Sequence, residues 1–165
     1  MQYVFHILIA CILICGSSTF AQQYTPQFTD YPSRVIQVRR SVKIQLHSTP
    51  YTACYRTMLR KTLREGQLFA GHYSLGHWGC GTCIRLGIVD LTNGRSYVTP
   101  FMASSAQGLI KVKADSRLVI IDDAESTDGT LYYLWTGKRL LPIFKGKVSP
   151  REPEPQFQNC AEMAH

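Results

Sequence analysis

A hairpin signal constrains this chain more than any other feature of its sequence. The stretch "TCIRLGIVDLTNGRSYVTPF" (residues 82–101) places Thr92, Asn93 and Gly94 between two apolar runs. Asn-Gly favours a tight hairpin turn because both residues tolerate positive φ. The pattern therefore predicts a two-stranded hairpin in which residues 84–91 pair with residues 95–101.

Further segments carry strand signals. "SVKIQLHS" (residues 41–48) alternates apolar and polar residues, which predicts a half-buried strand. "SRLVIID" (residues 116–122) is typical of a buried strand, and "TLYYLWTGKRLLPIF" (residues 130–144) predicts a second hairpin that turns near Gly137. From Phe69 onward we expect the chain to be all β.

One segment ahead of these strands has helical spacing. "STPYTACYRTMLRKTLREG" (residues 48–66) offers Ser48 or Thr49 as a cap, Pro50 in the first turn and Gly66 past the end. Its apolar residues leave four basic side chains largely toward solvent: Arg56, Arg60, Lys61 and Arg64. The predicted fold is α+β, with one N-terminal amphipathic helix packed on an antiparallel β-meander of about five or six strands.

The first residues have the pattern of a secretory leader. An apolar run from Val4 to Cys15 precedes small Thr19 and Ala21, which predicts a signal peptide over residues 1–21 with cleavage after Ala21. The run is shorter than the roughly 20 apolar residues of a membrane span. Lipidation at Cys11 within "LIAC" is an alternative. We expect a secreted or periplasmic protein.

The remaining chain divides into zones of different composition. Residues 22–33 carry two prolines without periodicity and predict a linker or an arm laid over the domain. Residues 34–148 hold the strand and helix patterns and predict one α+β domain. Residues 149–165 contain three prolines without a core pattern and predict a C-terminal tail.

The net charge of +7 lies wholly outside the predicted leader. A basic exported protein attracts anionic partners, and we expect an anionic component of the envelope or an acidic protein. Scattered basic residues also serve solubility, and only residues 34–40 and 56–64 are densely basic. The predicted compartment and the lack of a recognised binding motif disfavour nucleic acid. No cofactor is expected.

Four cysteines follow the predicted leader: Cys54, Cys80, Cys83 and Cys160. An even number in an exported chain favours disulfides, and the sequence leaves three pairings open. The preferred pairing joins Cys80 to Cys83 and Cys54 to Cys160, because Gly79 and Gly81 allow the dihedrals of a tight ring.

Three chemical alternatives surround the C-x-x-C of Cys80 and Cys83. A zinc site with His72 and His77 lacks a second cysteine pair. Thiol-disulfide exchange needs a thiolate stabilised by a helix N-terminus, whereas "IRLGIVD" after Cys83 predicts a strand.

The third alternative is peptidoglycan L,D-transpeptidation, because "CIRLGIVD" resembles the cysteine signature of those exported enzymes. The resemblance implies Cys83 as nucleophile, His77 or His72 as base, and Arg85 holding the substrate or the loop. The His-Gly pair of that signature is absent, since Gly81 and Thr82 stand in its place. A role without catalysis is therefore favoured.

Four motifs in order also resemble a group of small exported bacterial proteins of unassigned function. They are "FAGHYSLGHWGCGTC", "GIVDLTNGRSYVTPF", "DSRLVIID" and "YYLWTGKRLLPI", and they cover residues 69–143. The cysteines are closer together here than in that group. The resemblance implies export and the fold but no activity. We expect a disulfide-supported, non-catalytic binding or accessory protein of the bacterial cell envelope, with a cysteine-dependent envelope enzyme as the alternative.

Overall fold

The fold was obtained as a computed structural model that describes residues 24–48, 52–79, 84–99, 109–122 and 129–150. The predicted signal peptide, Cys80, Cys83, Cys160 and most of the predicted tail lie outside these ranges. A short 3-10 turn, η1 (Phe28–Asp30), precedes the helix α1 (Arg56–Glu65). The strands are β1 (Gln67–Phe69), β2 (Tyr73–Gly79), β3 (Ile84–Asp90), β4 (Ser96–Val98), β5 (Leu109–Lys111), β6 (Leu118–Asp122), β7 (Thr130–Trp135), β8 (Leu140–Phe144) and β9 (Lys147–Val148).

The strands form two antiparallel sheets, so the predicted α+β meander is wrong. One sheet has the order β1-β2-β3-β4 and the other the order β5-β6-β7-β8-β9. The molecule is mostly β, and α1 follows a long irregular segment instead of lying at the N-terminus. Local patterns identify individual strands, but the division into two sheets depends on which faces bury one another.

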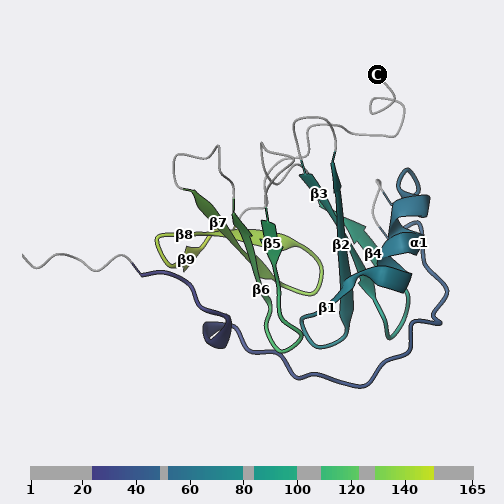
Figure 1. Cartoon of the computed structure of the whole chain (residues 1–165), viewed down its shortest axis with the longest axis horizontal. Helices are drawn as coiled ribbons and strands as arrows, with labels where there is room; N and C mark the ends of the chain where they lie inside the picture. The colour runs from purple at the N-terminus through teal and green to yellow at the C-terminus, as the bar shows by residue number, and fades with distance from the viewer. Residues whose placement is uncertain (1–23, 49–51, 80–83, 100–108, 123–128, 151–165) are drawn as a thin grey trace, which may run out of the picture.

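The two sheets pack face to face, with α1 on the outer side of the first sheet (Figure 1). Residues of both sheets share one core, in which Leu86 and Ile88 meet Val119, Ile121 and Trp135. All seven residues of β3 are buried because this strand lies between α1 and the second sheet. The continuous apolar run of β3 suits a strand covered on both faces.

The helix α1 begins later than the sequence predicts. Tyr55 occupies the N-cap without a side-chain cap bond, so Ser48 and Pro50 do not start the helix, while Gly66 ends it as expected. Leu59 and Leu63 pack on the first sheet. The four basic residues predicted to face solvent (Arg56, Arg60, Lys61 and Arg64) are all exposed.

The predicted hairpins are confirmed. Strands β3 and β4 pair across the turn that holds Gly94, whose φ is +79°, and β7 pairs with β8 across the turn that holds Gly137, whose φ is +89°. Strand β6 occupies the predicted buried segment. These elements were predictable because turn chemistry and apolar periodicity are local properties.

Residues 24–48, which we call the strap, lie along the outside of both sheets (Figure 1). Near its start, Ser116 donates its hydroxyl to the carbonyl of Phe28, and Ser33 donates its amide to Asp115 at 2.7 Å. Near its end, the amide of Gln45 donates to Gly94 at 2.8 Å. Residues 41–48 alternate in exposure as predicted, but they make only an isolated parallel bridge, Gln45 with Arg95, instead of a strand.

Candidate binding site

An open groove of about 1230 Å³ lies along β4, the edge strand of the first sheet. Three segments far apart in sequence form its walls: the end of the strap, the β3–β4 turn and the β7–β8 turn. The lining residues are Val42, Lys43, Ile44, Gln45, Leu46, His47, Ser48, Thr92, Asn93, Arg95, Tyr97 and Lys138. We call this feature the basic groove.

The charged residues that line the basic groove are all basic. Lys43, His47, Arg95 and Lys138 are all exposed, and none of the lining residues is an Asp or a Glu. Each wall contributes one cation, because Lys43 comes from the strap, Arg95 from the β3–β4 turn and Lys138 from the β7–β8 turn. A concave surface with like charges concentrates oppositely charged ligands from solution.

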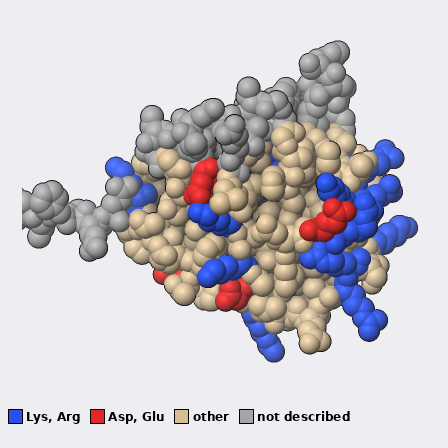
Figure 2. All heavy atoms as spheres, viewed as in Figure 1, with Lys and Arg blue, Asp and Glu red and all other residues tan. Residues whose placement is uncertain are grey.

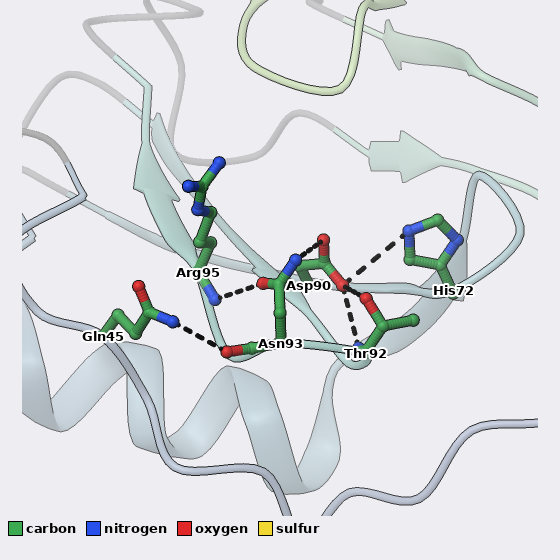
Figure 3. Close-up of polar contacts among 6 residues, drawn as sticks. All are labelled: Gln45, His72, Asp90, Thr92, Asn93 and Arg95. Atoms are coloured by element: carbon green, nitrogen blue, oxygen red, sulfur yellow. Dashed lines mark hydrogen bonds and ion pairs between the residues drawn. The ribbon is translucent and has the colours of Figure 1, made fainter.

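The hairpin turn beside the groove is held by one buried carboxylate (Figure 3). Asp90 Oδ1 accepts from the amide of Thr92 at 2.8 Å and from its hydroxyl at 2.5 Å, and Oδ2 accepts from Asn93 Nδ2 at 2.9 Å. The Asn93 Oδ1 in turn accepts from the amide of Arg95 at 2.8 Å. The turn therefore has a fixed shape, and the side chain of Arg95 extends away from it (Figure 3).

The strap is fastened to this turn at very close range. Gln45 Nε2 donates to the carbonyl of Asn93 at 2.9 Å, and the hydroxyl of Ser96 donates to the carbonyl of Gln45 at 2.6 Å. A Cβ at Gly94 would overlap the carbonyl oxygen of Lys43. The positive φ and the missing side chain of Gly94 thus allow the two walls to meet.

Aromatic packing connects the groove to the core. Tyr97 lines the groove, and its ring lies edge-on to Trp135 at 5.2 Å between centroids. Trp135 is almost fully buried and also contacts Tyr73 at 5.3 Å. Burial, and second the nearby Asp90 carboxylate, raise the pKa of Tyr73, so its phenol stays neutral beyond the usual range.

His72 lies beside the same carboxylate, with its Nε2 3.7 Å from Asp90 Oδ1. In a catalytic triad the histidine stands between the carboxylate and the hydroxyl, so that it can take the proton. Here Asp90 stands between His72 and the hydroxyl of Thr92 (Figure 3). The arrangement holds a turn in place and positions no base on a nucleophile.

Of the predicted catalytic residues, the structure describes His72, His77 and Arg85, and these three do not converge. Cross-strand partners share a face of a sheet, and the register pairs His77 with Leu86 and Trp78 with Arg85. Leu86 belongs to the core between the sheets, whereas Trp78 packs on the side of α1. His77 and Arg85 therefore lie on opposite faces, and His72 lies beyond the other end of β2.

The predicted cysteine sites are only partly described. Cys54 is disulfide-bonded, and its partner lies outside the described residues. The next residue, Tyr55, contacts Trp78 at 5.1 Å between ring centroids, and the Arg85 guanidinium lies 5.6 Å from the Tyr55 ring. Cys80 and Cys83, in the connection between β2 and β3, lie outside the described residues.

Within the described ranges, no group of three or more His, Cys, Asp or Glu side chains is arranged to hold a metal ion. In the same part of the chain, no helix has both the length and the apolar character needed to cross a membrane.

No family model, curated protein or solved structure matches this chain. The groove is therefore the feature of the chain that indicates a function. Sequence reasoning missed Lys43, Arg95, Tyr97 and Lys138, although it identified the turns that carry two of them. Basic residues beside every predicted turn were the available signal, but nothing in the sequence places these turns next to one another.

Proposed function

We propose that this protein is an exported, non-catalytic binding or accessory protein of the bacterial cell envelope, which holds an anionic ligand in the basic groove. The observation that carries the proposal is the charge of the groove, where Lys43, His47, Arg95 and Lys138 line a hollow without a carboxylate among its lining residues. The fastened turn supports the proposal further, because walls that are already fixed lose little entropy when a ligand binds.

The proposal favours binding over a cysteine enzyme as the main activity. An enzyme of that kind needs a base within hydrogen-bond reach of its thiol and a substrate-holding group on the same side. His77 and Arg85 lie on opposite faces of the first sheet, which disfavours that arrangement. The export part of the proposal rests on the leader pattern and on the disulfide of Cys54.

Binding is tested with purified cell-wall polymers and with the charge variant Arg95→Gln/Lys138→Gln. We expect the wild type to bind at low salt, where attraction between the basic groove and an anionic polymer is weakly screened. The variant is expected to lose at least about tenfold in affinity, because it removes two of the charges that provide this attraction. The matched control is Lys145→Gln/Lys147→Gln, which removes two exposed charges from the second sheet away from the groove lining. Equal loss in both variants would overturn the assignment to the groove.

Export is tested on protein recovered from the cell envelope. We expect the mature chain to begin at Gln22, since the small residues Thr19 and Ala21 precede that position. Intact-mass measurement gives the N-terminus directly. Retention of Met1 would contradict the leader, and a lipid mass on Cys11 would replace cleavage after Ala21 with an anchor.

A further inference from the structure

The exposed side of α1 carries an arginine at every fourth position. These residues are Arg56, Arg60 and Arg64, which we call the arginine stripe, and all three are exposed. Side chains four residues apart lie on the same side of a helix, about 6 Å apart along its axis. Lys61 is exposed on the same helix, so α1 presents four cations and a single exposed carboxylate, Glu65.

This arrangement favours the helix only at Arg64, which lies in the last turn, where the helix dipole favours a cation. Like charges four residues apart repel one another, and Arg56 stands at the helix N-terminus, where the helix dipole favours an anion. The first turn contains no acidic residue. Among the described residues, the three arginines take part in no ion pair. An anionic partner would remove this repulsion. A helix surface that only had to be soluble would be more stable with acidic and basic residues mixed.

The arginine stripe lies next to the basic groove. The guanidinium of Arg40 donates to the carbonyls of Leu63 at 2.9 Å and of Gly66 at 2.7 Å, which fixes the strap at the C-terminal end of α1. Lys43, which lines the groove, follows three residues later, and three residues of chain span at most about 10 Å. Figure 2 shows Lys and Arg side chains gathered on the side where α1 lies.

We propose that the arginine stripe and the basic groove bind one ligand together, a linear cell-wall polymer that carries a phosphate in each repeat. This inference rests on the proposed function and adds the class of the ligand. Guanidinium groups match the oxygens of a phosphate with paired hydrogen bonds, which favours phosphate for a surface built on arginine. A helix of ten residues is about 15 Å long. Together with the stretch of up to about 10 Å between the groove and the end of α1, the ligand extends as far as about 25 Å from the groove.

The burial of α1 favours a polymer over a lipid surface. Helices that lie in a membrane interface insert an apolar face among the lipids. In α1 the apolar residues Leu59 and Leu63 are buried in the protein core, and Met58 is the one large apolar side chain of the helix that is well exposed. The helix therefore presents a charged ridge along which an extended polyanion fits.

The test compares short and long glycerol-phosphate oligomers in a direct binding titration of the full mature protein. The short oligomer fits within the groove, and the long one exceeds about 30 Å, enough to pass along α1. We expect the long oligomer to bind at least about tenfold more tightly, because a second contact on the same chain adds avidity. The variant Arg56→Gln/Arg60→Gln/Arg64→Gln is expected to lose this gain while it binds the short oligomer as the wild type does.

The matched control is Arg117→Gln/Lys145→Gln/Lys147→Gln, which removes three exposed charges from the β5–β6 connection and the β8–β9 hairpin. This control is expected to bind the long oligomer more tightly than the short one, as the wild type does. Melting temperatures of both variants verify that they fold. Equal affinity of the wild type for both oligomers would overturn the inference while leaving the groove as a site. Binding to phosphatidylglycerol vesicles without binding to the long oligomer would also overturn it. Failure to bind either oligomer or any purified cell-wall polymer would reject the proposed function as well.

Discussion

At the scale of single residues, Asp90 determines the shape of the candidate site. The side chain is almost fully buried, and its two oxygens accept three hydrogen bonds from the turn that follows β3. Without it, the amide of Thr92 would lose its hydrogen-bond acceptor at a part-buried position. A polar group in such a position costs about as much as a lost hydrogen bond or more. The sequence could not assign this role, because an Asp before a turn has many uses.

We expect Asp90→Ala to lower the free energy of unfolding by about 2 kcal/mol, since it leaves donors of the turn without an acceptor. Urea denaturation measures the loss. Asp115→Ala provides the control, because the Asp115 side chain is exposed. Similar losses in the two variants would contradict the role assigned to Asp90.

A second prediction concerns Tyr73, whose pKa is raised first by burial and second by Asp90. The folded state holds this proton more tightly than the unfolded chain does. The stability that follows from the raised pKa is therefore present below about pH 10 and is lost as the pH rises through the folded pKa. We expect Tyr73→Phe to lose less stability than the wild type between about pH 8 and about pH 11, measured by urea midpoints. Parallel losses would contradict the prediction.

At the scale of elements, the sequence was a good guide to hairpins and a poor one to the groove. The turn at Gly94 and the strand β3 follow from local chemistry, so they could be predicted. The start of α1 could not, because residues 48–50 match a cap pattern while the helix begins only at Arg56. The groove forms because the strap at Lys43 packs against the β3–β4 turn. No local sequence pattern encodes this contact between distant segments.

The meeting of strap and hairpin gives a prediction with an internal control. Gly94→Ala places a methyl group against the carbonyl of Lys43 at a positive φ, and we expect a loss of about 3 kcal/mol or more. Gly129→Ala has a similar φ, +68°, but meets nothing within 4 Å, and we expect about 1 kcal/mol. Thermal unfolding of both variants makes the comparison. Equal losses of stability in the two variants would contradict the claim that the strap leaves no room for a side chain at Gly94.

At the scale of the whole molecule, the two sheets, α1 and the strap form one body with two separate apolar cores. The sequence predicted a single meander because consecutive strands usually pair, and the change of sheet between β4 and β5 has no local signal. The apolar run of β3 did indicate a strand with both faces buried, but it did not reveal which elements cover them.

The cysteines give a prediction at this scale. We expect peptide mapping under non-reducing conditions to recover Cys80 joined to Cys83 and Cys54 joined to Cys160. Recovery of Cys54 joined to Cys80 or Cys83 would contradict this pairing, and the contact of Tyr55 with Trp78 near the end of β2 makes it the competing outcome. In either case we expect Cys54→Ser to cost about 2–4 kcal/mol, measured by thermal unfolding.

The strap also sets the order in which the molecule can assemble. Phe28 accepts its hydrogen bond from Ser116, which is 88 residues further along the chain, and Pro32 bridges to the same residue. Contacts between such distant residues form late, because closing a long loop costs entropy before any contact repays it. The start of the strap thus docks fully only after residues that are synthesised much later. Until Ser116 has been made, Phe28, Tyr31 and Pro32 lack the partner that holds them in the folded molecule.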